Sequence, residues 1–218
     1  MLFKPKDIVS GDFYWITLAG DAVLYVTADC TGHGVPGGFM TMLGTSLLNE
    51  IVNEKKMNEP AAILNELREK IISSLRQTGA SGESKDGMDM VLCRFEKNKL
   101  IYAAANNSLY IIRNGLLKEY KPDKQPIGFY GDEKKPFTQH TIELMPGDMV
   151  YTFTDGYADQ FGGEKGKKFK YRQLEDLLCD IYAKPLSEQK KILDTTIEKW
   201  KEGYDQVDDI LLIGVKAG

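Results

Sequence analysis

Acidic residues recur beside short apolar runs in this sequence. Two of them directly follow such a run, and the others directly precede one. These acids are Asp12, Asp29, Asp155, Asp208 and Asp209. Carboxylates at strand ends, next to small residues, are held rigidly and stay open to a ligand, as Mg²⁺ or Mn²⁺ requires. If the strands bring these acids together, the sequence predicts a divalent metal site.

Each of these acids also has an ordinary explanation. Asp-Gly is a common turn dipeptide, and an aspartate at the end of a strand needs no function. For the Asp208-Asp209 pair the ordinary alternative is a solvated turn. The prediction of a metal site therefore depends on several acids converging.

Other catalytic chemistry finds little support in the side chains. The chain has two histidines, His33 and His140, and no serine between glycines in an elbow pattern. A covalent mechanism would therefore lack a base. Cys93 is followed by Arg94, but both belong to an alternating strand pattern, which indicates a core cysteine. A water activated by metal ions is the simpler chemistry, because two divalent ions can also neutralise the charge on a phosphoryl group.

Composition describes an ordinary globular chain of 218 residues with 42% hydrophobic residues and a formal net charge of −4. This charge argues against nucleic-acid binding and against attraction to anionic membranes. No run of about 18 apolar residues predicts a membrane span. The three cysteines are widely spaced, so we expect reduced thiols and a cytoplasmic protein.

Periodicity predicts mostly strands, with helices in two places. Strands are expected in 13–29, joined by a tight turn at 19–21, and in a meander over 88–120 with a hairpin at Asn114-Gly115. Further strands are expected in 138–144, 145–154 and 210–216. Apolar residues at three- and four-residue spacing predict helices over 39–52, 60–75, 171–183 and 187–201. The pattern indicates one domain of residues 1–218, with an α+β fold of antiparallel sheet and helices packed outside it.

Five ordered motifs carry a resemblance to a known family. They are "DIVSGDFYW", "ADCTGHGVPGGFMTMLG", "AAANNSLYIIRNG", "LMPGDMVYTFTDGYADQFGG" and "VDDILLIGV". Together they resemble the metal-dependent protein phosphatases of the 2C type, in the SpoIIE-like bacterial branch, over residues 6–216. The resemblance implies a sandwich of two antiparallel β-sheets flanked by helices, with a centre of two Mg²⁺ or Mn²⁺ ions at one edge.

The resemblance also implies roles for single residues. Asp29 matches the acid that bridges both metals, and the backbone carbonyl of Cys30 matches a ligand of the second metal. Asp155 and Asp208 match ligands of the first metal, with Asp209 as the other candidate. Asp12 matches the outer acid that holds metal-bound water.

Two further residues remain open. In the broader family a histidine directly after the aspartate-glycine pair acts as general acid, but here Cys30, Thr31 and Gly32 intervene before His33. Asp89 either approaches a third metal position or is a strand acid facing solvent.

The implied activity is hydrolysis of phosphoserine or phosphothreonine on a regulatory protein of the anti-anti-sigma type. The implied partners are that phosphoprotein and an upstream sensor or dimerisation domain, so the chain is expected to be a catalytic module of a longer protein. A catalytically idle domain that only binds a partner is the main alternative. A hydrolase of small phosphoesters is a third, for which the sequence shows no base-stacking groups.

Overall fold

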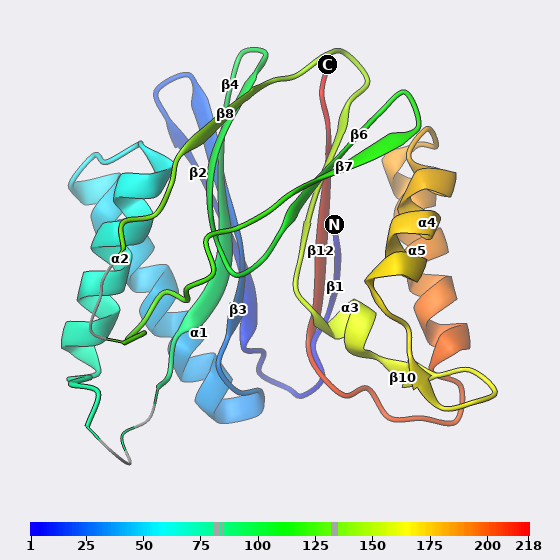
Figure 1. Cartoon of the computed structure of the whole chain (residues 1–218), viewed down its shortest axis with the longest axis horizontal. Coiled ribbons are helices and arrows are strands. Elements are labelled where there is room, and N and C mark those ends of the chain that lie inside the picture. Colours follow the sequence, from blue (N-terminus) through cyan, green and yellow to red (C-terminus); the bar gives the residue numbers. More distant parts are fainter. Residues whose placement is uncertain (81–82, 84, 132–134) are drawn as a thin grey trace.

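The computed structural model describes residues 1–80, 83, 85–131 and 135–218, and it contains two antiparallel sheets of five strands. The first sheet consists, in spatial order, of β2 (Asp12–Ala19), β3 (Ala22–Cys30), β4 (Met88–Glu96), β5 (Lys99–Ala105) and β8 (His140–Glu143). The second consists of β1 (Leu2–Lys4), β12 (Ile210–Lys216), β9 (Met149–Phe153), β6 (Leu109–Arg113) and β7 (Leu116–Tyr120). The sheets face each other, and helices cover their outer faces (Figure 1).

Helices pack on the outside of each sheet. The first sheet is covered by α1 (Gly34–Leu48), its π-helical continuation η1 (Asn49–Glu54) and α2 (Pro60–Ser74), and the second by α4 (Tyr171–Ile181) and α5 (Leu186–Trp200). A short helix, α3 (Gly156–Asp159), and a small hairpin of β10 (Phe161–Gly162) and β11 (Lys167–Lys168) follow β9. The predicted sandwich of two antiparallel sheets with flanking helices is confirmed.

Strand β3 shows why the layers form. Leu24 and Val26 alternate with Tyr25 and Thr27, so one set packs toward the helices and the other faces the opposite sheet. Both sets are buried. At the centre of the sandwich the Thr27 hydroxyl lies 2.6 Å from the Thr152 hydroxyl of β9. Paired hydroxyls between the sheets avoid leaving a buried polar group without a partner.

Two tight turns agree with their sequence signals. Gly20 has a φ of 61°, and Asn114 and Gly115 have φ values of 52° and 80°. These are left-handed conformations that glycine and asparagine adopt at low cost. The local signals for both hairpins were therefore sufficient.

The predicted meander over 88–120 is wrong. Strands β4 and β5 belong to the first sheet, whereas β6 and β7 belong to the second. The chain changes sheet between Ala105 and Leu109, where Asn106 adopts a φ of 57°. Periodicity within a strand does not indicate which sheet the strand joins. The sequence pattern therefore could not predict that the chain passes from one sheet to the other between β5 and β6.

Helix α1 begins five residues earlier than the apolar spacing predicted, and its buried face differs. Gly37, Gly38 and Gly44 are buried, while Phe39 is 68% and Met42 is 70% exposed. A Cβ on Gly37 would lie 2.3 Å from the Gly32 carbonyl oxygen, so only glycine allows this close packing. The helix therefore approaches the preceding loop with its smallest residues and leaves large apolar side chains outside.

The three cysteines form no disulfide, and Cys30 and Cys93 are buried. None of the helices in the described part of the chain is both long enough and apolar enough to cross a bilayer.

Candidate metal centre

Three predicted acids lie on adjacent strands of the first sheet. Asp12 pairs with Asp29 in the β2–β3 register, and Asp29 pairs with Asp89 in the β3–β4 register. Asp12 is only 3% exposed, and the other two are partly buried. The Asn106 side-chain amide donates a hydrogen bond of 2.8 Å to Asp89 Oδ1. Register alone therefore places three carboxyl groups in a row at one end of this sheet.

The second sheet brings two more acids to the same end. Asp155 follows β9 and precedes α3, and Asp208 lies just before β12, which pairs with β9. Thr154 joins the two sheets here, because its hydroxyl donates a 2.6 Å hydrogen bond to Asp12 Oδ2. The same hydroxyl accepts a bond of 3.0 Å from the Leu211 amide. The ends of both sheets are thus held together next to the acids.

These carboxyl groups interact strongly with one another. Burial, together with the charges of the neighbouring acids, raises the pKa of Asp12 to about 8 and that of Asp29 to about 9. Burial and the charge of Asp208 raise the pKa of Asp155 to about 6, although Lys168 acts in the opposite direction. Burial also raises the pKa of Asp89. Each shift has the same physical cause, which is a carboxylate removed from water without enough positive charge beside it.

The donor chemistry of this end fits a hard divalent cation. The clustered side-chain donors are carboxylate oxygens, which Mg²⁺ and Mn²⁺ prefer. Among the described residues, no three His, Cys, Asp or Glu side chains are already arranged as a set of ligands around one point. The arrangement is one of acids that converge and repel, and a cation would relieve that repulsion.

Asp209 plays a different part from Asp208. Its carboxylate is 2% exposed and accepts hydrogen bonds from the Lys6 amide at 2.7 Å and from the Gly11 amide at 2.8 Å. Both oxygens are therefore occupied by backbone N–H groups. Asp209 fixes the segment that leads into β2, and this segment carries Asp12.

The loop after Asp29 brings backbone oxygens close together. The Cys30 amide donates to the Gly11 carbonyl at 3.2 Å, and a Cβ on Gly11 would lie 2.3 Å from the Gly32 carbonyl oxygen. Gly32 and Gly34 have φ values of 83° and 63°. The glycines of this loop therefore permit a sharp turn and a close backbone approach directly after Asp29.

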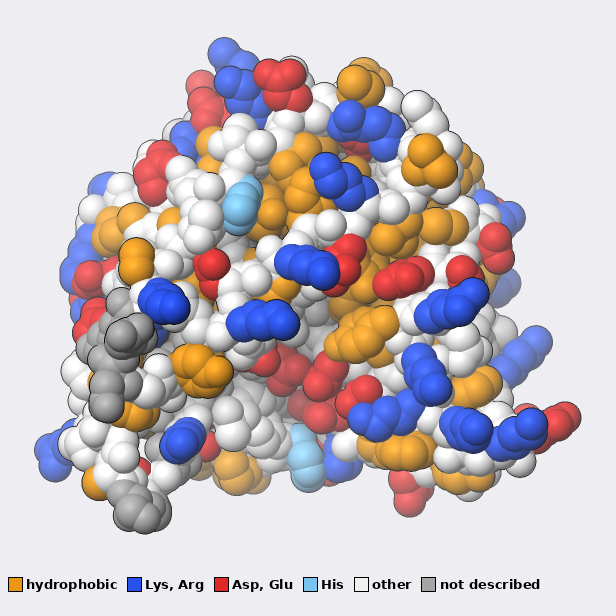
Figure 2. All heavy atoms as spheres, viewed as in Figure 1, with side chains coloured by type: hydrophobic (Ala, Val, Ile, Leu, Met, Phe, Trp, Pro, Cys, Tyr) orange, Lys and Arg blue, Asp and Glu red, His pale blue; other side chains and the backbone are white. Residues whose placement is uncertain are grey.

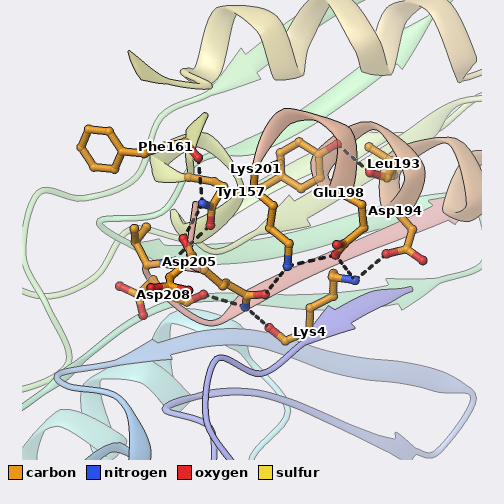
Figure 3. A network of polar contacts seen from close by, with 12 residues as sticks. Lys4, Tyr157, Phe161, Leu193, Asp194, Glu198, Lys201, Asp205 and Asp208 are labelled. Atoms are coloured by element: carbon orange, nitrogen blue, oxygen red, sulfur yellow. Dashed lines mark hydrogen bonds and ion pairs between the residues drawn. The ribbon is translucent and has the colours of Figure 1, made fainter. Parts of the chain in front are cut away.

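A polar network positions Asp208 (Figure 3). The Gln206 side-chain amide donates to the Lys4 carbonyl at 2.7 Å and to the Asp208 carbonyl at 2.9 Å. The buried Gln160 side chain donates to the Asp205 carbonyl at 2.9 Å and accepts from the Val207 amide at 3.2 Å. Segment 205–208 thus has its backbone bound on both sides before β12 begins.

His33 is exposed at the start of α1. Its Nδ1 lies 2.9 Å from Asp7 Oδ2, and its Nε2 lies 3.0 Å from Lys6 Nζ. The ring is therefore engaged by the segment before β2.

Sequence reasoning missed several residues that shape this end of the molecule. Thr154 and Gln160 act through hydrogen bonds to distant segments, and neither has a local pattern. Asn106 has a left-handed φ of 57°, and its bond to Asp89 has no signal in the local sequence. The spacing of "FTDG" after a buried strand was the one signal that could have drawn attention to Thr154.

Comparisons with known proteins agree with this fold. The family model described as Stage II sporulation protein E (SpoIIE) matches residues 19–218. Protein IcfG of Synechocystis sp. is 26% identical over 237 residues, which cover 98% of this chain and 37% of that protein. The chain thus spans little more than a third of this relative.

Two solved structures show the same architecture. The SiaA-PP2C domain of Pseudomonas aeruginosa superposes with a TM-score of 0.88 at 33% identity, covering 100% of this chain and 85% of that one. The PP2C phosphatase domain of SpoIIE from Bacillus subtilis, solved with a fragment of its regulatory domain, superposes with a TM-score of 0.76 at 14% identity. That match covers 99% of this chain and 61% of the other. On its sequence and its fold, this chain belongs to the SpoIIE family of PP2C-type phosphatase domains.

Proposed function

We propose that this chain is a serine/threonine protein phosphatase that uses two Mg²⁺ or Mn²⁺ ions to hydrolyse phosphoserine or phosphothreonine on a regulatory protein. The observation that carries the proposal is the meeting of Asp12 and Asp29 from one sheet with Asp155 and Asp208 from the other. Burial and mutual charge raise the pKa of Asp12, Asp29 and Asp155. Membership of the family makes this cluster the natural place for the ions.

The roles follow the expectations from the motifs. Asp29, in the middle of the row of three, would bridge the ions, with the Cys30 carbonyl as a backbone ligand. Asp155 and Asp208 would complete the set, and Asp12 would hold a water through the carboxylate that Thr154 orients. When bound, the two ions supply a nucleophilic water and neutralise charge on the phosphoryl group.

Asp208 is the better ligand candidate of the acid pair. Asp209 would have to give up its hydrogen bonds to the Lys6 and Gly11 amides before it could bind a cation. Those bonds are charge-assisted and buried, so losing them is costly. We therefore assign Asp209 to positioning the segment before β2.

Attack by a side-chain nucleophile finds no support. Burial raises the pKa of the Cys30 thiol and raises that of the Cys93 thiol to about 12, so neither forms a thiolate readily. His33 is bound on the surface to Asp7. A water nucleophile remains the simplest interpretation.

The rival function is a catalytically idle domain that binds a regulatory partner. It is favoured by an apolar groove of about 490 Å³ on the surface, which includes the exposed side chains of Ile8, Val35, Phe39 and Met42. We propose instead that this surface of a catalytically active domain contacts a regulatory domain. A fragment of such a domain was solved together with the SpoIIE phosphatase domain. An idle domain and an active phosphatase would both show slower hydrogen exchange in helix α1 when that regulatory domain is bound. Only a measurement of phosphatase activity therefore distinguishes the two functions.

The deciding experiment is phosphate release from a phosphoserine protein or peptide by the purified chain. We expect release with Mn²⁺ and none with a chelator. Asp155→Asn should be inactive, and a buried acid elsewhere, changed in Asp148→Asn, should leave release intact if the protein is folded. If wild type releases no phosphate with millimolar Mn²⁺ while the metal still binds, the idle-domain function replaces the proposal.

A further inference from the structure

A short segment beside the acids carries a concentrated positive charge. Residues 163–172, "GEKGKKFKYR", contain five Lys and Arg side chains and one Glu, in a chain whose formal net charge is −4. All five basic side chains are exposed. They are Lys165, Lys167, Lys168, Lys170 and Arg172. We call residues 161–172 the basic hairpin. They comprise β10, β11 and the turn between them, followed by the first two residues of α4.

The basic hairpin is anchored firmly at its base. The Gly163 amide donates to the Trp200 carbonyl at 2.8 Å, and the Trp200 indole donates to the Gln160 carbonyl at 3.0 Å. The Phe169 ring meets the Trp200 ring edge-on at 5.3 Å. A Cβ on Gly162 would lie 1.8 Å from the Trp200 carbonyl oxygen, so the hairpin sits directly against α5. Its charges are therefore carried on a fixed support.

The same hairpin lies one helical turn from Asp155. Lys168 Nζ lies 2.7 Å from Asp159 Oδ2, and the Asp159 amide donates to the Asp155 carbonyl at 2.9 Å. On the other side, the Tyr171 ring lies 6.1 Å from the Phe153 ring of β9. In Figure 2, Lys and Arg side chains gather over this part of the molecule, next to a group of Asp and Glu side chains. Positive charge thus borders the acid cluster.

Most of this positive charge has no ion-pair partner among the residues that the structure describes. Lys168 is paired with Asp159, but among the described residues no carboxylate forms an ion pair with Lys165, Lys167, Lys170 or Arg172. Exposed charges of one sign close to a reaction site attract ligands of the opposite sign. The hairpin is therefore available to a negatively charged ligand that reaches the acids.

We propose that the basic hairpin binds an acidic segment that flanks the phosphorylated residue of the protein substrate. The inference rests on the proposed phosphatase function and narrows its substrate class to phosphoproteins with Asp or Glu beside the phosphosite. A peptide fits better than nucleic acid or a membrane, because the positive surface is one hairpin wide on an otherwise acidic chain. An extended polyanion would be repelled by the rest of the surface.

The test compares three phosphoserine peptides of equal length, whose flanking residues are Asp, Ser or Lys. The variant is Lys165→Gln, Lys167→Gln, Arg172→Gln, which keeps the Lys168 ion pair and leaves Lys170, whose φ is 74°, unchanged. The matched control is Lys99→Gln, Lys191→Gln, Lys216→Gln, three exposed lysines outside the basic hairpin. Both triple variants change the net charge equally.

We expect wild type with Mn²⁺ to prefer the Asp-flanked peptide over the Ser-flanked one by about tenfold in kcat/KM at low ionic strength, and less at high salt. The hairpin variant should lose this preference, and the control should keep it. The inference is overturned if wild type shows no preference for the Asp-flanked peptide. It is also overturned if the hairpin variant and the control variant show the same preference.

Peptide binding, measured by fluorescence anisotropy, separates this inference from the proposed function. If no peptide releases phosphate, the phosphatase function fails. The basic hairpin is still supported as a peptide-binding surface if wild type binds the Asp-flanked peptide selectively and the hairpin variant does not. Tighter binding of single-stranded DNA or of phosphatidylserine vesicles than of the acidic peptide, at the same salt, would overturn the inference.

Discussion

The two ends of strand β9 carry buried carboxylates in opposite circumstances. Asp148, just before the strand, is 2% exposed, and its oxygens lie 2.9 Å from Arg113 Nε and 2.6 Å from Arg113 Nη2. The Arg113 guanidinium lowers the pKa of Asp148. Asp155, just after the strand, belongs to a group of acids, and burial raises its pKa to about 6. Asp148 is paired directly with a cation, whereas Asp155 lies among other acids and the nearby Lys168 is paired with Asp159 instead.

This difference shows how to distinguish a structural acid from a functional one. A buried carboxylate is costly unless a positive charge or several hydrogen bonds compensate it. At Asp148 the compensation is built into the chain. Among the described residues, the one side-chain hydrogen bond to Asp12 or Asp29 is the bond from the Thr154 hydroxyl to Asp12. The fold itself therefore leaves these acids in need of positive charge.

The largest expected effect is on turnover. Asp29→Asn and Asp155→Asn should each reduce Mn²⁺-dependent phosphate release by at least about a hundredfold, because a neutral amide cannot hold divalent ions as a carboxylate does. Asp148→Asn should stay within about threefold of wild type when it is assayed below its melting temperature. Near-normal release by Asp29→Asn at saturating Mn²⁺ would remove that residue from the centre.

Stability should respond with opposite signs at the two ends. Arg113→Ala should lower the free energy of unfolding by about 1–2 kcal/mol, since Asp148 loses charge-assisted bonds from a partly exposed partner. Asp29→Asn in chelator should instead raise it by about 1 kcal/mol or more, because an amide folds without the cost of desolvating or protonating a carboxylate. Urea unfolding of wild type, Arg113→Ala and Asp29→Asn in chelator measures both changes in the free energy of unfolding. A loss of stability in metal-free Asp29→Asn would contradict the comparison.

The pH dependence should also separate the ends. For Asp12, Asp29 and Asp155 the pKa is raised on folding, so they stabilise the metal-free fold most below about pH 4. That contribution is lost as the pH rises to about 9. Asp148 has a lowered pKa, so its contribution is present above about pH 4 and is lost as the pH falls further.

Unfolding free energies at pH 5, 7 and 9 provide the measurement. In chelator they should decrease with pH, and saturating Mg²⁺ should flatten the decrease, since cations neutralise the ionised acids. A metal-free protein that becomes more stable from pH 5 to pH 9 would show that the acids are already compensated within the chain.

A smaller effect should distinguish the adjacent acids. Asp209→Asn keeps an acceptor oxygen for only one of the Lys6 and Gly11 amides and places an NH2 group against the other. We therefore expect a loss of about 2 kcal/mol in stability and a decrease in turnover of no more than about tenfold. Asp208→Asn should have nearly unchanged stability in chelator and a much larger decrease in turnover. Titration of activity with Mn²⁺ compares the two, and equal decreases would mean that Asp209 also binds metal.

Local signals predicted most of the elements, and long-range contacts account for what was missed. Alternation and helical spacing indicated nearly all longer strands and helices, and Gly20 and Asn114-Gly115 marked their turns correctly. Strand β1 is three residues long and owes its position to pairing with β12. The β10–β11 hairpin, with two residues in each strand, is likewise held by contacts with Trp200 rather than by a pattern of its own.

The candidate site follows the same division. The strand-end acids were identified from their positions, and the resemblance of the motifs gave them roles. The bonds that position them join residues far apart, such as Asp209 with Lys6 and with Gly11, which are 203 and 198 positions away. The polar, glycine-rich residues 79–87 and the turn-rich residues 121–136 lie partly outside the described residues.

Metal-dependent thermal stability tests the central claim most directly, because it needs no substrate. A cation that binds only the folded state stabilises it by about 2.7 kcal/mol at a hundred times its dissociation constant. For a domain of this length that is roughly 5–10 °C in Tm. Melts of wild type, Asp155→Asn and the control Asp148→Asn in chelator and in Mn²⁺ should show this shift in wild type and in the control, and little in Asp155→Asn. The same Tm for wild type with and without Mn²⁺, or an equal shift in Asp155→Asn, would contradict the convergence of these acids on a metal ion.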